Sequence, residues 1–187
     1  HIKKNTFISF FVFPIRILKN SKFFSISLSG IPQTNYISFR SDYKVKHDLQ
    51  EVIHQKLLLD ILYDDPMDIR RIPTLYLWFK ASEQVECLPI DSAPVKTKEY
   101  YSDGMSANLL PLQVRYPKYL THTYKIALKS NQYKSLLYRF KYTILFYRYS
   151  FHNKTFKLLN FRDLPFFAIG YICAFCDLLR LAIFYKE

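Results

Sequence analysis

The chain has 187 residues, and 27 Lys and Arg against 15 Asp and Glu give it a formal net charge of +12 at pH 7. Because it holds only three glycines and neither a GxGxxG nor a GxxxxGK(S/T) pattern, a Gly-rich loop for nucleotide phosphates is excluded. Its three cysteines form no closed disulfide framework, which argues against a small secreted fold.

The charges are segregated along the chain, and this predicts four segments. Residues 1–40 carry six bases and no acid, and residues 41–103 carry twelve acids against eight bases. Residues 104–162 carry eleven bases and no acid, and residues 163–187 carry three acids against two bases. Two cationic stretches around an acidic middle indicate contact with polyanions, either nucleic acid or an anionic membrane. Codon bias in an AT-rich genome is the alternative explanation.

The N-terminal segment predicts a basic arm with short strands. It lacks acids and is rich in Ser, Phe and Lys, as organellar targeting sequences are, but Pro14 and Arg16 interrupt its apolar run. Residue 1 is His and the first Met is Met67, so we expect a processed product, a partly observed one or a non-standard start. The expected strands are Thr6–Val12 and Phe23–Leu28, followed by a turn at Gly30–Pro32.

The acidic middle of the chain predicts a helix, a strand and a loop. Apolar residues recur at helical spacing, and Asp48 followed by Glu51 resembles a capping box, so we expect an amphipathic helix over His47–Tyr63. The run Ile72–Phe79 is rich in aromatic and branched residues, which is typical of a strand. Prolines and charged residues then predict a linker or surface loop over Ala81–Gly104.

The acid-free tract 104–162 is the most informative part of the sequence. Its 59 residues hold eleven Lys or Arg and thirteen Tyr or Phe. Without internal carboxylates the tract cannot neutralise its own charge, so we expect it to face an anionic partner or to stay solvated. Pro111 and Pro117 predict an extended conformation over Leu109–Leu120.

From Ser130 onward the tract predicts a helix with a cationic side. Lys134, Lys141 and Arg148 recur every seven residues and therefore lie on one side of such a helix. In one alternative the bases are only solvated and the tyrosines complete a core; in another the region is a strand pair with a turn at His152–Lys154. The expected apolar face is Leu136, Leu137, Phe140, Ile144 and Tyr147, and the tyrosines of the first alternative are Tyr138, Tyr142 and Tyr149.

The last segment predicts an apolar helix. Phe166–Tyr185 is long enough to span a bilayer. Asp177 and Arg180 near its centre would each cost about 2.5–3.5 kcal/mol in a membrane, although their i, i+3 spacing allows them to pair. A helix docked on a partner protein explains these charges as well as a membrane span does.

The chain offers few candidates for catalysis or metal binding. Cys173 and Cys176 have the spacing of a redox or half-zinc motif, but they lie in an apolar helix, so we expect packing cysteines. His47, Glu51 and His54 could hold a metal if they shared a helix face, although any solvated face would carry such residues. We therefore expect no enzyme, no catalytic residue, no metal site, no cofactor and no small-molecule substrate. The acids Asp64, Asp65 and Asp68 around Pro66 indicate a helix stop.

These elements predict an α+β fold, a small mixed domain with extended basic arms and a C-terminal apolar helix. We expect the 47–63 helix and the 130–149 element to pack on each other or on partner subunits. Because long cationic arms bury little apolar area, we expect the isolated chain to fold poorly.

Three functional hypotheses follow from the charge pattern. The first is a structural RNA-binding component of a large ribonucleoprotein, an organellar (mitochondrial) ribosome in the matrix, with rRNA and neighbouring protein subunits as partners. The second is an accessory subunit of a mitochondrial inner-membrane respiratory or ATP-synthase complex, with membrane contact through Phe166–Tyr185. The third is a small metal-dependent enzyme that uses the 47–54 helix. For the first hypothesis the expected RNA-binding residues are Arg115, Lys118, Lys125, Lys129, Lys134, Arg139, Lys141, Arg148, Tyr116, Tyr119, Tyr133 and Tyr138.

Overall fold

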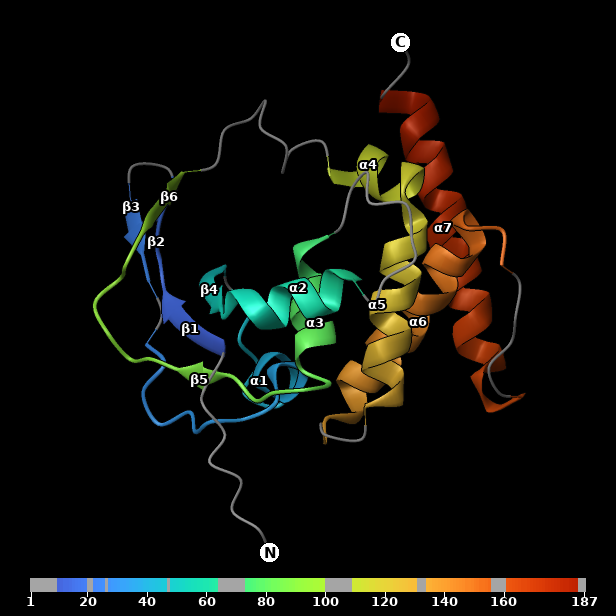
Figure 1. Ribbon diagram of the computed structural model, residues 1–187. Coiled ribbons are helices and arrows are strands. Elements are labelled where there is room, and N and C mark those ends of the chain that lie inside the picture. Colours follow the sequence, from blue (N-terminus) through green and yellow to red (C-terminus); the bar gives the residue numbers. More distant parts are fainter. Residues whose placement is uncertain are drawn as a thin grey trace, which may run out of the picture. The chain divides into compact units, whose positions relative to one another are not determined.

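The computed structural model describes residues 10–19, 22–25, 27–46, 48–63, 73–99, 109–130, 134–155 and 161–184. The chain has the predicted α+β class and the predicted C-terminal apolar helix (Figure 1). The strands are β1 (Phe10–Pro14), β2 (Arg16–Lys19), β3 (Lys22–Phe24), β4 (Leu49–Ile53), β5 (Leu88–Pro89) and β6 (Thr97–Glu99). The helices are α1 (Tyr36–Ser41), α2 (Gln55–Tyr63), α3 (Thr74–Ala81), α4 (Leu109–Arg115), α5 (Pro117–Lys129), α6 (Leu136–His152) and α7 (Leu164–Phe184).

The chain divides into two compact units. Unit 1 comprises His1–Asp68 and Lys80–Tyr100, and unit 2 comprises Ile69–Phe79 and Tyr101–Glu187. Unit 1 therefore holds the described strands together with α1 and α2. Unit 2 holds α4 to α7 and all of α3 except its last two residues.

The described residues of unit 1 form two three-stranded sheets, and each is built around a strand from the N-terminal region. In the first sheet, β1 lies between β4, which runs antiparallel to it, and β5, which runs parallel. In the second sheet, β2 lies between antiparallel β3 and parallel β6. Burial alternates along β1, where Phe10 and Val12 are buried and Phe11 is half-buried, as expected of a strand with one face in a core.

A buried polar cluster fastens α1 to β4. The Tyr36 hydroxyl donates a hydrogen bond to Glu51 Oε1 (2.5 Å), and Arg40 Nη2 donates to the Tyr36 oxygen (2.7 Å) and to Glu51 (2.9 Å). Burial raises the pKa of Tyr36 well above its ordinary value, so the phenol keeps the proton that it donates. The Tyr36 ring also stacks on Phe10 at 5.2 Å, which joins this cluster to the apolar core of unit 1.

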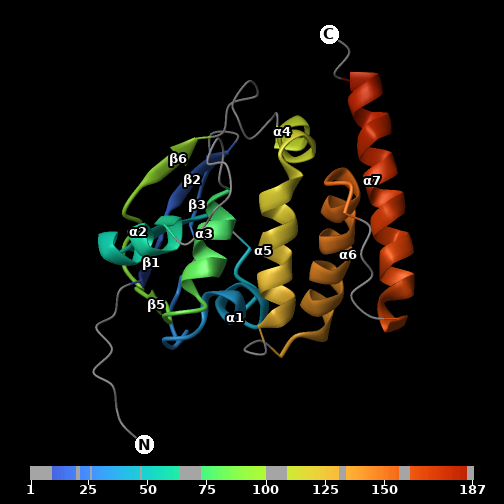
Figure 2. The ribbon, with the colours of Figure 1, turned by 45° about the vertical axis from the view of Figure 1, so that its right-hand side comes forward.

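Unit 2 is a layer of helices with a core made largely of tyrosines. Helices α5, α6 and α7 lie side by side in that order (Figure 2). The phenol of Tyr149 donates a hydrogen bond to Gln113 of α4 (2.9 Å), so the polar atom of this core tyrosine has a partner. The ring pairs, with centroid distances, are Tyr76–Tyr119 (5.4 Å), Phe79–Tyr142 (5.9 Å), Tyr124–Tyr142 (5.9 Å) and Tyr124–Tyr149 (5.8 Å).

The prediction of a helix over His47–Tyr63 is wrong for the first half of this segment. Leu49–Ile53 forms β4, and α2 begins only at Gln55. The apolar spacing fits a helix, but β4 pairs with β1 along its whole length, and this long-range pairing decides the conformation. Glu51 is therefore part of the polar cluster with Arg40 rather than of a capping box.

Two segments that were predicted to be extended are helical. Ile72–Phe79 was predicted as a strand, but Thr74–Ala81 is a helix because aromatic residues one turn apart both reach the tyrosine core. Leu109–Leu120 contains α4 and the start of α5. Pro111 lies in the first turn of α4 and Pro117 is the first residue of α5, where a missing N–H breaks no helical hydrogen bond.

The predictions for the N-terminal strands, for the turn at Gly30 and for the loop over Ala81–Gly104 are correct in part. Among the described residues β1 starts at Phe10, β3 ends before the predicted Leu28, and β2 was not expected. Gly30 lies in the predicted turn with a positive φ of 74°. The predicted loop Ala81–Gly104 contains β5 and β6, and Cys87 is buried, because this segment pairs with both N-terminal strands.

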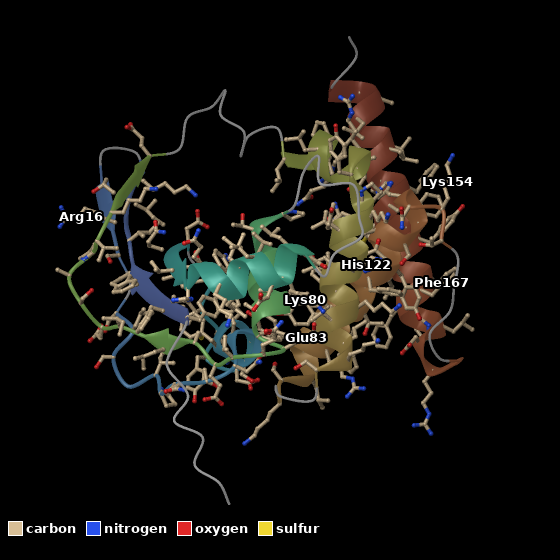
Figure 3. All side chains as sticks on the ribbon, in the orientation of Figure 1. Arg16, Lys80, Glu83, His122, Lys154 and Phe167 are labelled. Carbon is tan, nitrogen blue, oxygen red and sulfur yellow. The ribbon has the colours of Figure 1, made fainter. Side chains whose placement is uncertain are left out.

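The two C-terminal helices confirm the predicted helical segments, but the buried face of α6 differs from the predicted one. The alternative of a strand pair is wrong, because Leu136–His152 is one helix; a turn at Asn153–Lys154 follows it, and Lys154 (labelled in Figure 3) has a φ of 55°. Tyr124 of α5 lies against Tyr142 and Tyr149, so the tyrosines of α6 belong to the core, as the first alternative proposed for them. The exposed residues of the predicted apolar face are Leu136, Leu137 and Phe140, and the buried tyrosines are Tyr138, Tyr142, Tyr147 and Tyr149.

Candidate nucleic-acid interface

Three exposed lysines form a line along α5. Lys118, Lys125 and Lys129 are spaced at i, i+7 and i+11, which places them on one side of the helix. At a rise of 1.5 Å per residue this line is about 16 Å long. The exposed side chain of His122, labelled in Figure 3, lies on the same side between the first two lysines. We call the three lysines the α5 stripe.

The opposite side of α5 is buried, and this fixes the direction of the stripe. Tyr119 and Tyr124 both turn into the tyrosine core, where Tyr124 stacks on Tyr149 with an interplanar angle of 8°. Thr123, fully buried, satisfies its hydroxyl by donating to the Tyr119 carbonyl (2.7 Å). The α5 stripe is therefore held on a helix that packs firmly along its other side.

The charge of the α5 stripe is not neutralised by the part of unit 2 that the structure describes. Among the described residues no carboxylate lies within 4 Å of Lys118, Lys125 or Lys129. The two acids of unit 2 within the described ranges are engaged elsewhere: Asp163 accepts from the Tyr147 hydroxyl (3.3 Å), and Asp177 pairs with α6. The stripe consequently produces a positive potential along this side of α5.

Lys118 is placed where helix stability alone would not favour a cation. It is the second residue of α5, whose first turn contains no acid, and the positive end of the helix dipole disfavours Lys there. Lys129 in the last turn has the opposite, favourable relation to the dipole. The dipole therefore accounts for one end of the stripe and not for the other, which favours a functional role for Lys118.

The other predicted basic residues lie outside the α5 stripe. Arg115 at the end of α4 is exposed, with its guanidinium carbon 5.6 Å from the ring centroid of Tyr116. Lys134, Arg139 and Lys141 are exposed around the first turns of α6, and Lys141 lies 5.2 Å from the centroid of the Tyr138 ring. Lys134, Arg139 and Lys141 form a second basic group, at the start of α6.

The cationic side predicted from Lys134, Lys141 and Arg148 is interrupted at Arg148. Its guanidinium donates to both carboxylate oxygens of Asp177, from Nε to Oδ2 (2.7 Å) and from Nη2 to Oδ1 (2.6 Å). His152 Nε2 lies 3.0 Å from the same Oδ2. The i, i+3 spacing allows Asp177 to pair with Arg180 in its own helix, but it pairs across to α6 instead.

The predicted stacking tyrosines are divided between the core and the surface. Tyr119 and Tyr138 are buried in unit 2, so their rings are part of its packing. Tyr116 is half-buried beside Arg115, and Tyr133 lies outside the described residues. Among the described residues that were predicted to bind RNA, those with exposed side chains are therefore basic rather than aromatic.

A second unusual surface is the outer side of α7. The helix meets α6 through a narrow seam of Gly170, Ala174 and Asp177, spaced at i, i+4 and i+7. A Cβ atom on Gly170 would lie 2.7 Å from Tyr147 Cβ and 2.9 Å from the Ile144 carbonyl oxygen, so the two backbones approach closely there. Outside this seam α7 exposes Ile169, Tyr171, Ile172, Phe175, Leu178, Leu179 and Ile183.

By length and composition α7 is the one described helix that could cross a membrane, over Leu164–Ile183. Few of its residues are buried within the structure. So large an apolar surface marks contact with a lipid phase or with another protein.

The proposed metal site at His47, Glu51 and His54 loses its geometric basis. Its residues were placed on one helix, but Glu51 belongs to β4 and His54 follows that strand, while His47 lies outside the described residues. No group of three His, Cys, Asp or Glu residues suited to a metal occurs in the described part of the chain. Asp64, Asp65 and Asp68 also lie outside the described residues.

The extended conformation predicted for Leu109–Leu120 is wrong, and for this reason the α5 stripe was not predicted as a unit. The i, i+7, i+11 spacing of its three lysines is visible in the sequence and could have identified it. Comparison of the chain with protein-family models, curated proteins and solved structures found no match. The proposal of a function therefore depends on the geometry of these surfaces.

Proposed function

We propose that the chain is a structural RNA-binding component of a large ribonucleoprotein, a mitochondrial ribosome. The observation that supports this most is the α5 stripe, a straight line of exposed lysines that has no neighbouring carboxylate among the described residues. Lysines that neutralise phosphates provide sequence-independent affinity for nucleic acid and need no active site. The stripe lies within an acid-free tract, so the surrounding chain adds to the attraction rather than opposing it.

The outer face of α7 supports a place within an assembly. A face with this many exposed apolar side chains would be unfavourable in water, so a neighbouring protein subunit is expected to cover it. Basic helices that contact RNA on one side and apolar helices that contact neighbouring subunits on another suit a component that is buried in a large complex.

The alternative is an accessory subunit of a mitochondrial inner-membrane complex, anchored by α7. It is favoured by the length and composition of Leu164–Ile183. Against it, α7 runs in the same direction as α6 and contacts it from Phe166, which stacks on Phe140 (4.9 Å), to Asp177. A span in this arrangement would bring the bases of α6 to the depth of the hydrocarbon, at a cost of several kcal/mol.

The proposal can be tested with the full chain carrying an affinity tag in its native cells. We expect the tagged protein to sediment with a large particle, and nuclease treatment to release it. Replacing Lys118, Lys125 and Lys129 together with Gln should reduce this association at moderate salt. The control is the same exchange at Lys46, Lys56 and Lys96, which are exposed lysines of unit 1 and change the net charge equally.

Membrane extraction separates the two candidates. If α7 spans a membrane, the wild-type protein should resist carbonate extraction, and replacing Leu178 and Leu179 with Lys should abolish membrane retention. Carbonate-resistant membrane association without any nuclease-sensitive partner would contradict the ribosomal proposal and support the membrane subunit.

A further inference from the structure

We infer that the α5 stripe binds the phosphate backbone of double-helical RNA rather than the bases of a single strand. This inference rests on the proposed RNA-binding function and specifies the kind of RNA that the site takes. The evidence is the direction of the aromatic rings on α5, the type of its basic side chains and the rigidity of the helix that holds them.

The aromatic rings of α5 point away from the stripe. Proteins that bind single strands present aromatic side chains on which successive bases stack, next to a basic groove. Tyr119 and Tyr124 are the only tyrosines in α5, and both are buried in the core of unit 2. On the stripe itself the one ring is the imidazole of His122, so α5 does not offer a stacking platform for several bases.

The side chains of the stripe suit phosphates rather than base edges. Base recognition relies on bidentate donors and acceptors such as Arg, Asn and Gln, which match the edges of particular bases. A Lys ammonium group is a compact point charge that pairs with a phosphate without reading sequence. With three lysines and no Arg, Asn or Gln in the whole of α5, the stripe is equipped for backbone contacts.

The rigidity of α5 favours a rigid target. Its lysines are fixed along about 16 Å of helix by the packing of the opposite side. A double helix holds its phosphates in fixed rows, and proteins recognise double-stranded RNA through such phosphates and the 2′-hydroxyl groups. A flexible single strand would have to be ordered along the stripe without compensating base stacking, which costs conformational entropy.

The test compares two RNA probes on the full chain at several salt concentrations. One probe is an RNA duplex of about 20 base pairs, and the other is an unstructured uridine oligonucleotide with the same number of phosphates. We expect the duplex to bind at least about tenfold more tightly, a difference of roughly 1.4 kcal/mol. Anionic lipid vesicles serve as a third probe.

Charge and ring variants assign the contacts. Replacing the three lysines of the stripe with Gln should lower the slope of log Kd against log salt for the duplex by about two to three. The matched exchange at Lys46, Lys56 and Lys96 of unit 1 should leave this slope within about one unit of the wild-type value. His122→Ala should leave duplex binding unchanged, because the imidazole takes no part in backbone contacts.

Each contrary result has a distinct meaning. Equal or tighter binding of the uridine oligonucleotide, weakened by His122→Ala, would overturn the inference while leaving the RNA-binding function intact. A duplex affinity that does not respond to the stripe variant would overturn it as well. Binding of vesicles without binding of either RNA would contradict the proposed function itself.

Discussion

Arg148 of α6 and Asp177 of α7 form a bidentate ion pair, with hydrogen bonds of 2.7 Å and 2.6 Å, between two parallel helices. The carboxylate of Asp177 is buried, and His152 closes its remaining side at 3.0 Å. Burial is the largest single influence on the pKa of Arg148 and tends to lower it, but the hydrogen bonds to Asp177 and the charge interactions with Asp177 and its neighbours together raise that pKa. The pair thereby neutralises the acid within α7 and fixes the register of that helix on α6.

Removing the acid of this pair should destabilise unit 2. We expect Asp177→Asn to lower the free energy of unfolding by about 3 kcal/mol, because Arg148 would be left largely buried without a counter-charge. Urea denaturation followed by the fluorescence of Trp78, the only Trp of the chain and a residue of α3, measures this change. Adding Arg148→Met should recover part of the loss, and Asp60→Asn on the exposed side of α2 is the neutral control.

The close approach at Gly170 can be tested by adding one methyl group. Gly170→Ala should raise helix propensity, yet we expect a net loss of about 1–3 kcal/mol because the new Cβ would collide with α6. The colliding atoms include the Ile144 carbonyl and the Arg148 amide, which cannot rotate away. Denaturation with Trp78 as the probe checks the result; Ala182→Leu, on the exposed side of α7, should change stability by less than about 0.5 kcal/mol. A stabilised Gly170→Ala variant would contradict this geometry of the seam.

The outer face of α7 should govern solubility and assembly rather than folding. We expect replacement of Ile172, Phe175 and Leu179 with Glu to reduce self-association of the isolated chain in sedimentation experiments, because these side chains are exposed. The same variant should fail to enter the native particle or membrane. Ala174→Glu, which places a charge in the seam, should instead unfold unit 2. Loss of unit 2 structure in the triple variant would show that this face belongs to the core.

Unit 1 should lose stability at alkaline pH through Cys87. Burial raises the pKa of this thiol from 9.0 to about 12, so above about pH 9 the unfolded chain releases a proton that the folded chain retains. The stability that this group contributes is present below pH 9 and falls by up to about 1.4 kcal/mol per pH unit above it. Between about pH 8 and about pH 10, wild type should therefore lose roughly 1 kcal/mol more than Cys87→Ala, measured by urea denaturation with circular dichroism. Equal losses in the two proteins would contradict the burial of the thiol.

Local patterns in the sequence were sufficient for the helices of the C-terminal half. The helical patterns of α6 and α7 are long and uninterrupted, and residues close in sequence supply many of the contacts that hold each helix. Which side chains of α6 are buried was harder to predict. Leu136 and Leu137 are exposed while tyrosines are buried, because the ring of Tyr124 in α5 packs against the tyrosine side of α6. Partners of this kind are known only once the fold is known.

The errors in the first hundred residues come from long-range pairing. The β4 segment has helical spacing in sequence, but its conformation depends on β1, which lies about forty residues earlier. The same holds for β5 and β6, which complete sheets around the N-terminal strands. The proline rule failed at Pro117 for a local reason, since the first position of a helix accepts proline. That error also hid the α5 stripe, the main element of the candidate site.

Because Ile69–Phe79 belongs to unit 2 although unit 1 surrounds it in sequence, no single cut separates this protein into two complete folding fragments. A fragment that starts at Tyr101 would lack the Tyr76 and Phe79 rings, and the faces of Tyr119 and Tyr142 that these rings cover would be open to water. During synthesis, the segment that supplies these rings emerges well before the helices that it completes. In a nascent chain this aromatic segment must therefore stay unpacked until the helices of unit 2 are made, while the strands before and after it in sequence pair into the sheets of unit 1.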